Sequence, residues 1–213
     1  MVAPSSSTGR PPVRRDAVVA TVIATAMATT FTLFSSGPSL LVTFVPGVAL
    51  AYALFWTTCW RQMPEPSRIL PIYLIALAVQ FLHFTEEYLT RFDVRFPGLW
   101  SAPAYPRDLF VGFNMGAYAA FTVGALILFY RVRAVAMVPL FFVAYGVIGN
   151  AIGHAAFCIG ARGYFPGFWT SLAYWVLGPL LLKRLWETRR RTSGAGLAFS
   201  PVTTEQVDRG GET

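Results

Sequence analysis

The stretch ILPIYLIALAVQFLHFTEEYL, Ile69 to Leu89, joins a long apolar run to a histidine and two adjacent glutamates near its end. A helix needs about 20 mainly apolar residues to cross a bilayer core of about 30 Å, and this stretch supplies them. Placing a charged side chain inside such a helix costs about 2.5 kcal/mol or more. His83, Glu86 and Glu87 therefore need an explanation, and residues of this kind commonly mark a functional site in the membrane.

The rest of the chain is similarly apolar. Of its 213 residues, 55% are hydrophobic and 13% are charged, which is unusual for a soluble domain. We predict an all-α fold, a polytopic membrane helix bundle within residues 16–191, flanked by flexible tails at 1–15 and 192–213 that are poor in apolar residues. The six apolar runs that could cross the membrane are Ala17–Ser35, Ser39–Trp60, Ile69–Leu89, Leu109–Tyr130, Ala134–Ala161 and Phe165–Leu182.

The distribution of basic residues predicts the orientation of these helices. Cytoplasmic loops of membrane proteins carry an excess of Lys and Arg. With the N-terminus in the cytoplasm, only Arg91, Arg95, Arg107 and Arg162 fall on the outer side, which favours an N-in/C-in topology, and we expect it in the plasma membrane. The net charge of +7 then reflects topology, because the arginines form no stripe that would bind nucleic acid. The first run could instead be a secretory signal, although its apolar core exceeds the usual length of about 7–15 residues.

Polar residues of two predicted helices fall at one depth, in the outer half of the bilayer. The chain has two histidines, and both lie in this layer. His83 shares a helix face with Glu86 at i+3 and Glu87 at i+4. Asn150 shares a face with His154 at i+4 of the fifth run in the same way. We take these five residues as the candidate catalytic set.

Further residues at the same level are candidates for contact with a substrate. Asn114 enters the layer from the fourth run, and Phe113, Tyr145 and Trp169 are aromatic residues near it. The segments FPGLWSAPAY (residues 96–105) and FPGFWTSLAY (residues 165–174) also share a pattern. If they form an internal repeat about an axis along the membrane normal, the two histidines are counterparts.

A family resemblance rests on these motifs. HFTEE followed by FPG, then NAIGH and YFPG before an apolar C-terminal run, resembles the HXXEE family of integral membrane proteins over about residues 82–182. The resemblance implies a helical membrane fold and carries His83, Glu86 and Glu87 as the motif residues, with no activity attached. A weaker likeness is to the sterol-isomerase domain of emopamil-binding type, whose spacing differs, so it serves only as an analogy for the chemistry.

The first functional hypothesis is acid–base catalysis on a hydrophobic lipid or isoprenoid, of isomerase or cyclase type, with no cofactor. Two carboxylates in one apolar pocket cannot both ionise cheaply, so one can keep a proton for an alkene or epoxide while a histidine holds the other as an anion. Aromatic faces such as those of Phe81, Phe84 and Tyr174 can stabilise a carbocation. The expected partner is a hydrophobic small molecule, because no Lys or Arg lies inside the predicted layer to pair with a charged one.

Two alternatives remain open at this stage. His83, Glu86 or Glu87, and His154 would form a two-histidine, one-carboxylate set for a divalent metal such as zinc or iron, as in a membrane hydrolase or oxidase. The same polar groups could also act without catalysis, locking helices together or relaying protons.

The arginine asymmetry gives a direct test of orientation. In a chain whose two native cysteines are replaced, a cysteine placed between Arg91 and Arg107 should react with an impermeant thiol reagent added to intact cells. A cysteine between Arg61 and Arg68 should react only after the cells are lysed. The reverse labelling pattern would overturn the predicted topology.

Overall fold

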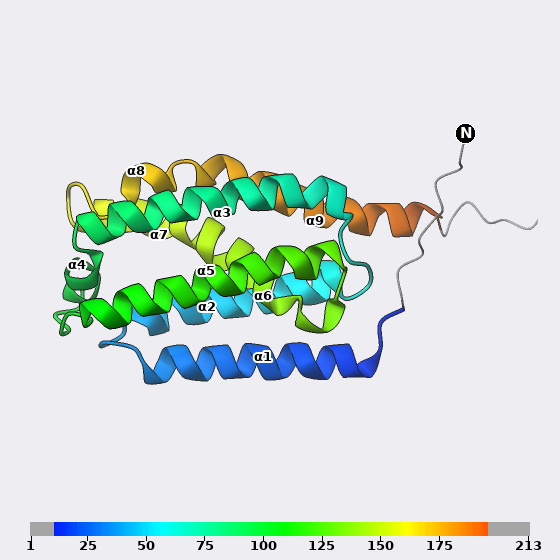
Figure 1. Ribbon diagram of the computed structural model, residues 1–213, viewed down its shortest axis with the longest axis horizontal. Helices are drawn as coiled ribbons and strands as arrows, with labels where there is room; N and C mark the ends of the chain where they lie inside the picture. The colour runs from blue at the N-terminus through cyan, green and yellow to red at the C-terminus, as the bar shows by residue number, and fades with distance from the viewer. Residues whose placement is uncertain (1–10, 196–213) are drawn as a thin grey trace, which may run out of the picture.

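The computed structural model describes residues 11–195 as an all-helical bundle, with no strand in that part of the chain (Figure 1). The long helices run side by side along one direction, which confirms the predicted helical class (Figure 1). The elements are α1 Arg14–Leu33, α2 Ser39–Leu54, η1 Phe55–Cys59, α3 Pro66–Leu89, α4 Phe92–Gly98, α5 Arg107–Phe129, η2 Arg133–Val135, α6 Met137–Phe141, η3 Phe142–Gly149, α7 Asn150–Gly160, α8 Phe168–Ser171 and α9 Tyr174–Ala195.

Five helices are long and apolar enough to cross a membrane by their length and composition. They span Arg14–Leu33, Ser39–Cys59, Pro66–Leu89, Arg107–Phe129 and Arg133–Gly160, and they overlap the first five predicted runs. The predicted tails at 1–15 and 192–213 lie largely outside the described residues, and α1 already begins at Arg14.

The sixth predicted span, Phe165–Leu182, does not form one helix. The chain turns at Pro166 and Gly167, forms the short α8, and starts α9 only at Tyr174. Gly167 has a φ of 85°, a left-handed conformation that glycine adopts without steric penalty and that no α-helix contains. α9 then continues past Lys183 and Arg184. It is not among the five described helices that are long and apolar enough to cross a membrane.

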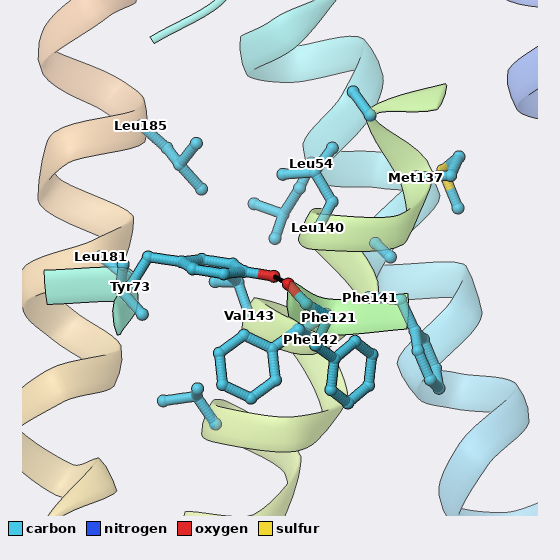
Figure 2. Packing of buried hydrophobic residues seen from close by; sticks show 14 of the residues in the cluster. Leu54, Tyr73, Phe121, Met137, Leu140, Phe141, Phe142, Val143, Leu181 and Leu185 are labelled. Atoms are coloured by element: carbon cyan, nitrogen blue, oxygen red, sulfur yellow. Dashed lines mark hydrogen bonds between the residues drawn. The ribbon is translucent and has the colours of Figure 1, made fainter. Parts of the chain in front are cut away.

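The core is built around η3, a π-helical segment that packs against α2, α3, α6, α7 and α9. Tyr73 of α3 is fully buried, and its hydroxyl donates a hydrogen bond of 2.8 Å to the Phe121 carbonyl of α5. Figure 2 shows this side chain between Leu181 of α9 and Phe121, beside Phe142 of η3. The absence of a side chain at Gly124 allows this contact, since a Cβ there would lie 2.5 Å from the Tyr73 hydroxyl.

η3 also sets the position of the polar residues that follow it. Gly47 of α2 lies close against Tyr145, where a Cβ would come within 2.8 Å of the tyrosine Cβ. The π-helical turns end at Gly149, and α7 starts with Asn150 on its buried side. Single π-helical turns inside α-helices are frequent at functional sites, because they change which face of the helix the next residues occupy.

The two Phe-Pro-Gly segments of the predicted repeat differ in local structure. Phe96 to Gly98 is helical and ends α4, whereas Phe165 to Gly167 forms the turn before α8. Phe96 and Phe165 nevertheless belong to one buried aromatic cluster, together with Phe92. The shared pattern therefore gives both segments a phenylalanine anchor at the same end of the bundle, but not the same backbone.

Candidate functional site

The structure brings His83, Glu87 and His154 together at the end of the bundle near α4 and α8. His83 and Glu87 lie one turn apart on α3, and His154 comes from α7. The Nε2 atoms of both histidines lie 3.4 Å from Glu87 Oε1. The two rings are nearly perpendicular, with centroids 4.6 Å apart, and the exposed fractions of the three residues are 0%, 6% and 2%.

Gly167 makes this close approach possible. A Cβ at this position would lie 2.5 Å from His154 Cε1 and 2.8 Å from His83 Cε1. Only glycine therefore fits here, both for its left-handed φ and for the space that the two rings occupy. The Pro166-Gly167 turn before α8 therefore packs directly against the two histidine rings.

Glu86 lies on a different face of α3 and does not contact the histidines. Its Oε1 accepts hydrogen bonds from the Tyr164 hydroxyl (2.8 Å) and the Trp169 backbone N–H (3.1 Å). Its Oε2 accepts from the Thr170 backbone N–H (2.8 Å) and the Thr170 hydroxyl (2.6 Å). An ionised carboxylate has about four lone-pair sites, so these bonds satisfy Glu86 as an anion.

Tyr164 takes part in this arrangement as a donor. It lies in the loop between α7 and α8, outside the membrane-spanning helices. Partial burial raises the pKa of its hydroxyl above the ordinary value, and the bond to Glu86 raises this pKa further. The phenol therefore keeps its proton across the neutral range and can donate a hydrogen bond to the Glu86 carboxylate.

Thr170 connects Glu86 to the histidine pair and fixes the ring of His83. Because the Thr170 hydroxyl donates to Glu86, its oxygen must accept the bond of 2.9 Å from Nδ1–H of His83. A neutral His83 then presents the lone pair of Nε2 to Glu87 Oε1, and this nitrogen has no hydrogen-bond partner in the part of the chain that the structure describes. A proton or a cation is needed between these two atoms, since two lone pairs would otherwise face each other.

The structure distinguishes the two glutamates that could complete the predicted set of metal ligands. The carboxylate that lies with His83 and His154 is Glu87, and not Glu86. One ligand atom from each of these three residues lies within 4.8 Å of the others. Adjacent helix residues point about 100° apart, so Glu86 and Glu87 cannot both face the same pair of rings.

Glu87 also reaches an apolar cavity of about 280 Å³. The cavity lies between α1, α2, α4 and α5, with α3, η3 and α7 at its buried side. Asn114, Phe113, Tyr145 and Asn150, all predicted to lie in the site, line it. A concave apolar space with a few converging polar groups is the usual form of a small-molecule site.

Trp169, the remaining predicted substrate contact, lies elsewhere. Its side chain is 65% exposed on α8, and it does not line this cavity. Its backbone N–H, and not its indole, serves the site through Glu86. The tryptophan is therefore a residue of the α8 surface in this structure.

A network of amides forms part of the cavity wall. Gln80 Oε1 accepts hydrogen bonds from the Tyr174 hydroxyl (2.7 Å) and, at 3.5 Å, from Asn150 Nδ2. Asn150 Nδ2 also donates to the Gly146 carbonyl of η3 at 3.1 Å. Asn114 Nδ2 donates to the Phe110 carbonyl at 2.9 Å, within its own helix. These bonds orient the amides of Gln80 and Asn150 beside Glu87.

Thr170, Tyr164 and Gly167 were not among the predicted residues of the site. All three lie in the segment YFPGFWT, which contributed only its repeat, its aromatic residues and its likeness to the family to the prediction. Thr170 occupies the Ser/Thr position of that pattern, and Gly167 its glycine. The pattern alone gave no signal that this loop folds back onto α3.

Comparisons with known proteins identify a family but no activity. The family model described as "Protein of unknown function with HXXEE motif" matches residues 74–181, which contain the motif and both histidines. No curated protein and no solved structure matches the chain.

Replacing Gly167 should disturb the histidine pair selectively. Gly167→Ala places a methyl group against both rings, so we expect the Cε1–Hε1 NMR signals of both histidines to shift in histidine-labelled protein. The assignment is simple because the chain has two histidines, provided that the purification tag contains none. Gly163→Ala is the matched control, since a Cβ there meets no atom within 4 Å. Unchanged ring signals in Gly167→Ala would contradict the described packing.

Proposed function

This chain belongs to the HXXEE family, and we propose that it is an integral membrane enzyme that moves protons on a hydrophobic substrate. The observation that carries the proposal is the position of Glu87. One of its oxygens lies 3.4 Å from both histidines, and the same residue lines the apolar cavity. A buried acid held between two bases at the wall of an apolar space is suited to proton transfer to a molecule that water cannot protonate well.

The two glutamates have different roles in this proposal. Glu87 is the acid, and His83 and His154 accept or return its proton. Glu86 is a positioning residue, because the described hydrogen bonds of its carboxylate all come from Tyr164 and α8. Asn150 contributes an oriented amide beside Glu87, and Asn114 lines the cavity from α5.

The simplest reaction is an isomerisation. Glu87 gives a proton to one carbon of an alkene, which leaves a carbocation on the neighbouring carbon. Loss of a proton from an adjacent carbon to the Glu87 carboxylate or to a histidine then forms a new double bond and restores the site. The reaction is balanced without an oxidant or a reductant. If the cation is attacked by a second double bond before the proton is lost, the same steps give a cyclase.

Aromatic side chains support a cationic intermediate. Phe113, Tyr145, Phe31 and Phe44 line the cavity and contact one another, with ring centroids of Phe44 and Tyr145 3.8 Å apart. Aromatic faces stabilise a cation by about 0.5–2 kcal/mol each. The described lining includes no Lys or Arg, which favours a substrate without a negative charge.

We propose a location from the same observations together with the arginine asymmetry. We place the protein in the plasma membrane with both ends in the cytoplasm and with the histidine pair in the outer half. Arg133 and Asp16, whose Nη1 and Oδ2 atoms are 3.6 Å apart, then mark the inner end of the bundle.

A second candidate function is supported by the geometry of the three side chains. Bonds of about 2.0–2.2 Å to a tetrahedral zinc ion separate neighbouring ligand atoms by about 3.3–3.6 Å. Both Nε2–Oε1 distances in the site are 3.4 Å, and a cation would satisfy the unpartnered Nε2 of His83. His83, Glu87 and His154 would hold zinc or iron, with an open position for water, in a metal-dependent hydrolase or oxidase.

A purely structural role accounts for fewer of the contacts. Glu86 does join α3 to α8, as a residue that locks helices together would. The contact between Glu87 of α3 and His154 of α7, by contrast, is 3.4 Å long, so it is no short hydrogen bond that locks these two helices together. Glu87 also lines a cavity, which a residue that served only packing would have no reason to do.

The acid–base proposal predicts opposite effects of the two glutamates. Glu87→Gln removes the titrating group but keeps the shape, so formation of the product should fall by about 10²–10⁴-fold while the protein still folds. Glu86→Gln should mainly lower the thermal stability in detergent, because an amide cannot accept all four bonds. The product is found by comparing lipid extracts of cells with and without the protein.

Glu65→Gln is the control for this pair, because Glu65 is exposed near the opposite end of α3. It should change neither the product nor the stability. A wild-type product level in well-folded Glu87→Gln protein would disprove the acid–base proposal.

Metal analysis separates the two candidates. If the second is correct, detergent-purified protein should carry about one zinc or iron ion per chain, and Glu87→Ala and His154→Ala should lose it. Glu65→Ala should retain the metal. Protein that contains no metal and takes up none from a zinc solution would exclude the second candidate and leave the first.

A further inference from the structure

The cavity has an open side between α1 and α5 that bears on how a ligand enters. Phe34, which follows α1, and Leu109 and Phe113 of α5 line the cavity and are 61%, 46% and 40% exposed. Both helices are among those long and apolar enough to cross a membrane. The exposed rim is therefore apolar and faces the side of the bundle, where lipid chains surround a membrane protein.

The opposite end of the cavity is polar and buried. Gln80, Glu87 and Asn150 line it with exposed fractions of 6%, 6% and 8%. The cavity thus leads from an apolar opening at the side of the bundle to a small group of hydrogen-bonding side chains. A ligand that fits this gradient has an apolar body and one short polar end.

The unpaired atoms at the buried end indicate what that polar group is. The bonds from Tyr174 to Gln80 Oε1 and from Asn150 Nδ2 to Gly146 fix how both amides are turned. Gln80 Nε2, Asn150 Oδ1 and Glu87 Oε2 are then left without a hydrogen-bond partner among residues 11–195. Gln80 Nε2 and Asn150 Oδ1, whose residues already share a hydrogen bond, offer one donor and one acceptor, which complement a hydroxyl group, since it both donates and accepts.

Other polar ends fit this group of atoms less well. A carboxylate or phosphate would lie beside Glu87 with no Lys or Arg in the described lining to offset its charge. A pure hydrocarbon would leave buried polar atoms without partners, which costs about 1–3 kcal/mol for each. A neutral alcohol avoids both penalties.

We infer that the ligand of this cavity is a neutral lipid alcohol, which enters from the bilayer between α1 and α5 and binds with its hydroxyl at Gln80 and Asn150, while Glu87 faces the chain of the molecule. The inference rests on the proposed function, in that it names the class of substrate on which Glu87 acts. It adds a route and a binding orientation, which the acid–base chemistry alone does not supply. The hydroxyl anchors the molecule, and the chain extends past the aromatic residues toward the opening.

Photolabelling in vesicles tests the ligand class. Protein in phosphatidylcholine vesicles is irradiated with hexadecanol that carries a diazirine on its chain, and adducts are mapped by mass spectrometry. Hexadecane and palmitic acid with the same diazirine are the comparison probes. We expect the alcohol to label cavity residues such as Phe44 and Phe110 several-fold more than either comparison probe. Gln80→Leu should reduce this preference about fivefold, the value of one neutral hydrogen bond.

A pair of variants on α1 tests the route. Thr30 lines the cavity at the exposed rim, whereas the adjacent Thr29 is exposed but does not line it. Thr30→Trp should obstruct the opening and reduce labelling of Phe44 and Phe110 severalfold, and Thr29→Trp should not. Both variants place a large apolar group on an exposed face, so the comparison controls for effects on folding.

The outcomes separate this inference from the proposed function. Equal labelling of the cavity by alcohol and hydrocarbon, or labelling unaffected by Thr30→Trp, would overturn the ligand class or the route, respectively. If the alcohol labels the cavity as expected but Glu87→Gln leaves the lipid products of the cell unchanged, the binding inference stands and the acid–base proposal falls.

Discussion

The four hydrogen bonds that the Glu86 carboxylate accepts hold α8 and the turn before it against α3. The positions of the other site residues depend on this contact. It positions Thr170, whose oxygen then fixes the ring of His83, and it brings Gly167 against both histidines. Charge-assisted hydrogen bonds are stronger than neutral ones, so a single anion that accepts four of them can hold a loop of this size in place.

The HXXEE motif thus places in consecutive residues one carboxylate that holds α8 and a second that lies against both histidines. On an α-helix the neighbouring side chains point about 100° apart, and this angle sends Glu86 toward α8 and Glu87 toward His154 and the cavity. His83 is linked to both glutamates, because its Nδ1 faces Thr170, which binds Glu86, and its Nε2 faces Glu87. The spacing of the motif follows from this, since the histidine must lie one turn before Glu87 to reach it.

The helical class and the first five long apolar helices followed from the sequence, because apolar length and helix periodicity are local properties. The partner of each glutamate could not be predicted. His83 lies at i+3 from Glu86 and at i+4 from Glu87, and both spacings allow contact on a helix. Which glutamate contacts His83 depends on α8, which forms because Gly167 turns the chain back. The predicted sixth helix had instead run without a turn from Phe165. The place of Trp169 was missed for the same reason.

The side opening between α1 and α5 has a consequence for how such a protein would work in a cell. A molecule that reaches the cavity through the bilayer is present at a concentration set by its mole fraction among the lipids of one leaflet, and not by its amount in water. Diluting that leaflet with inert lipid would slow the protein even at constant total substrate. The membrane around the protein would then act as its solvent, its store of substrate and the first recipient of its product.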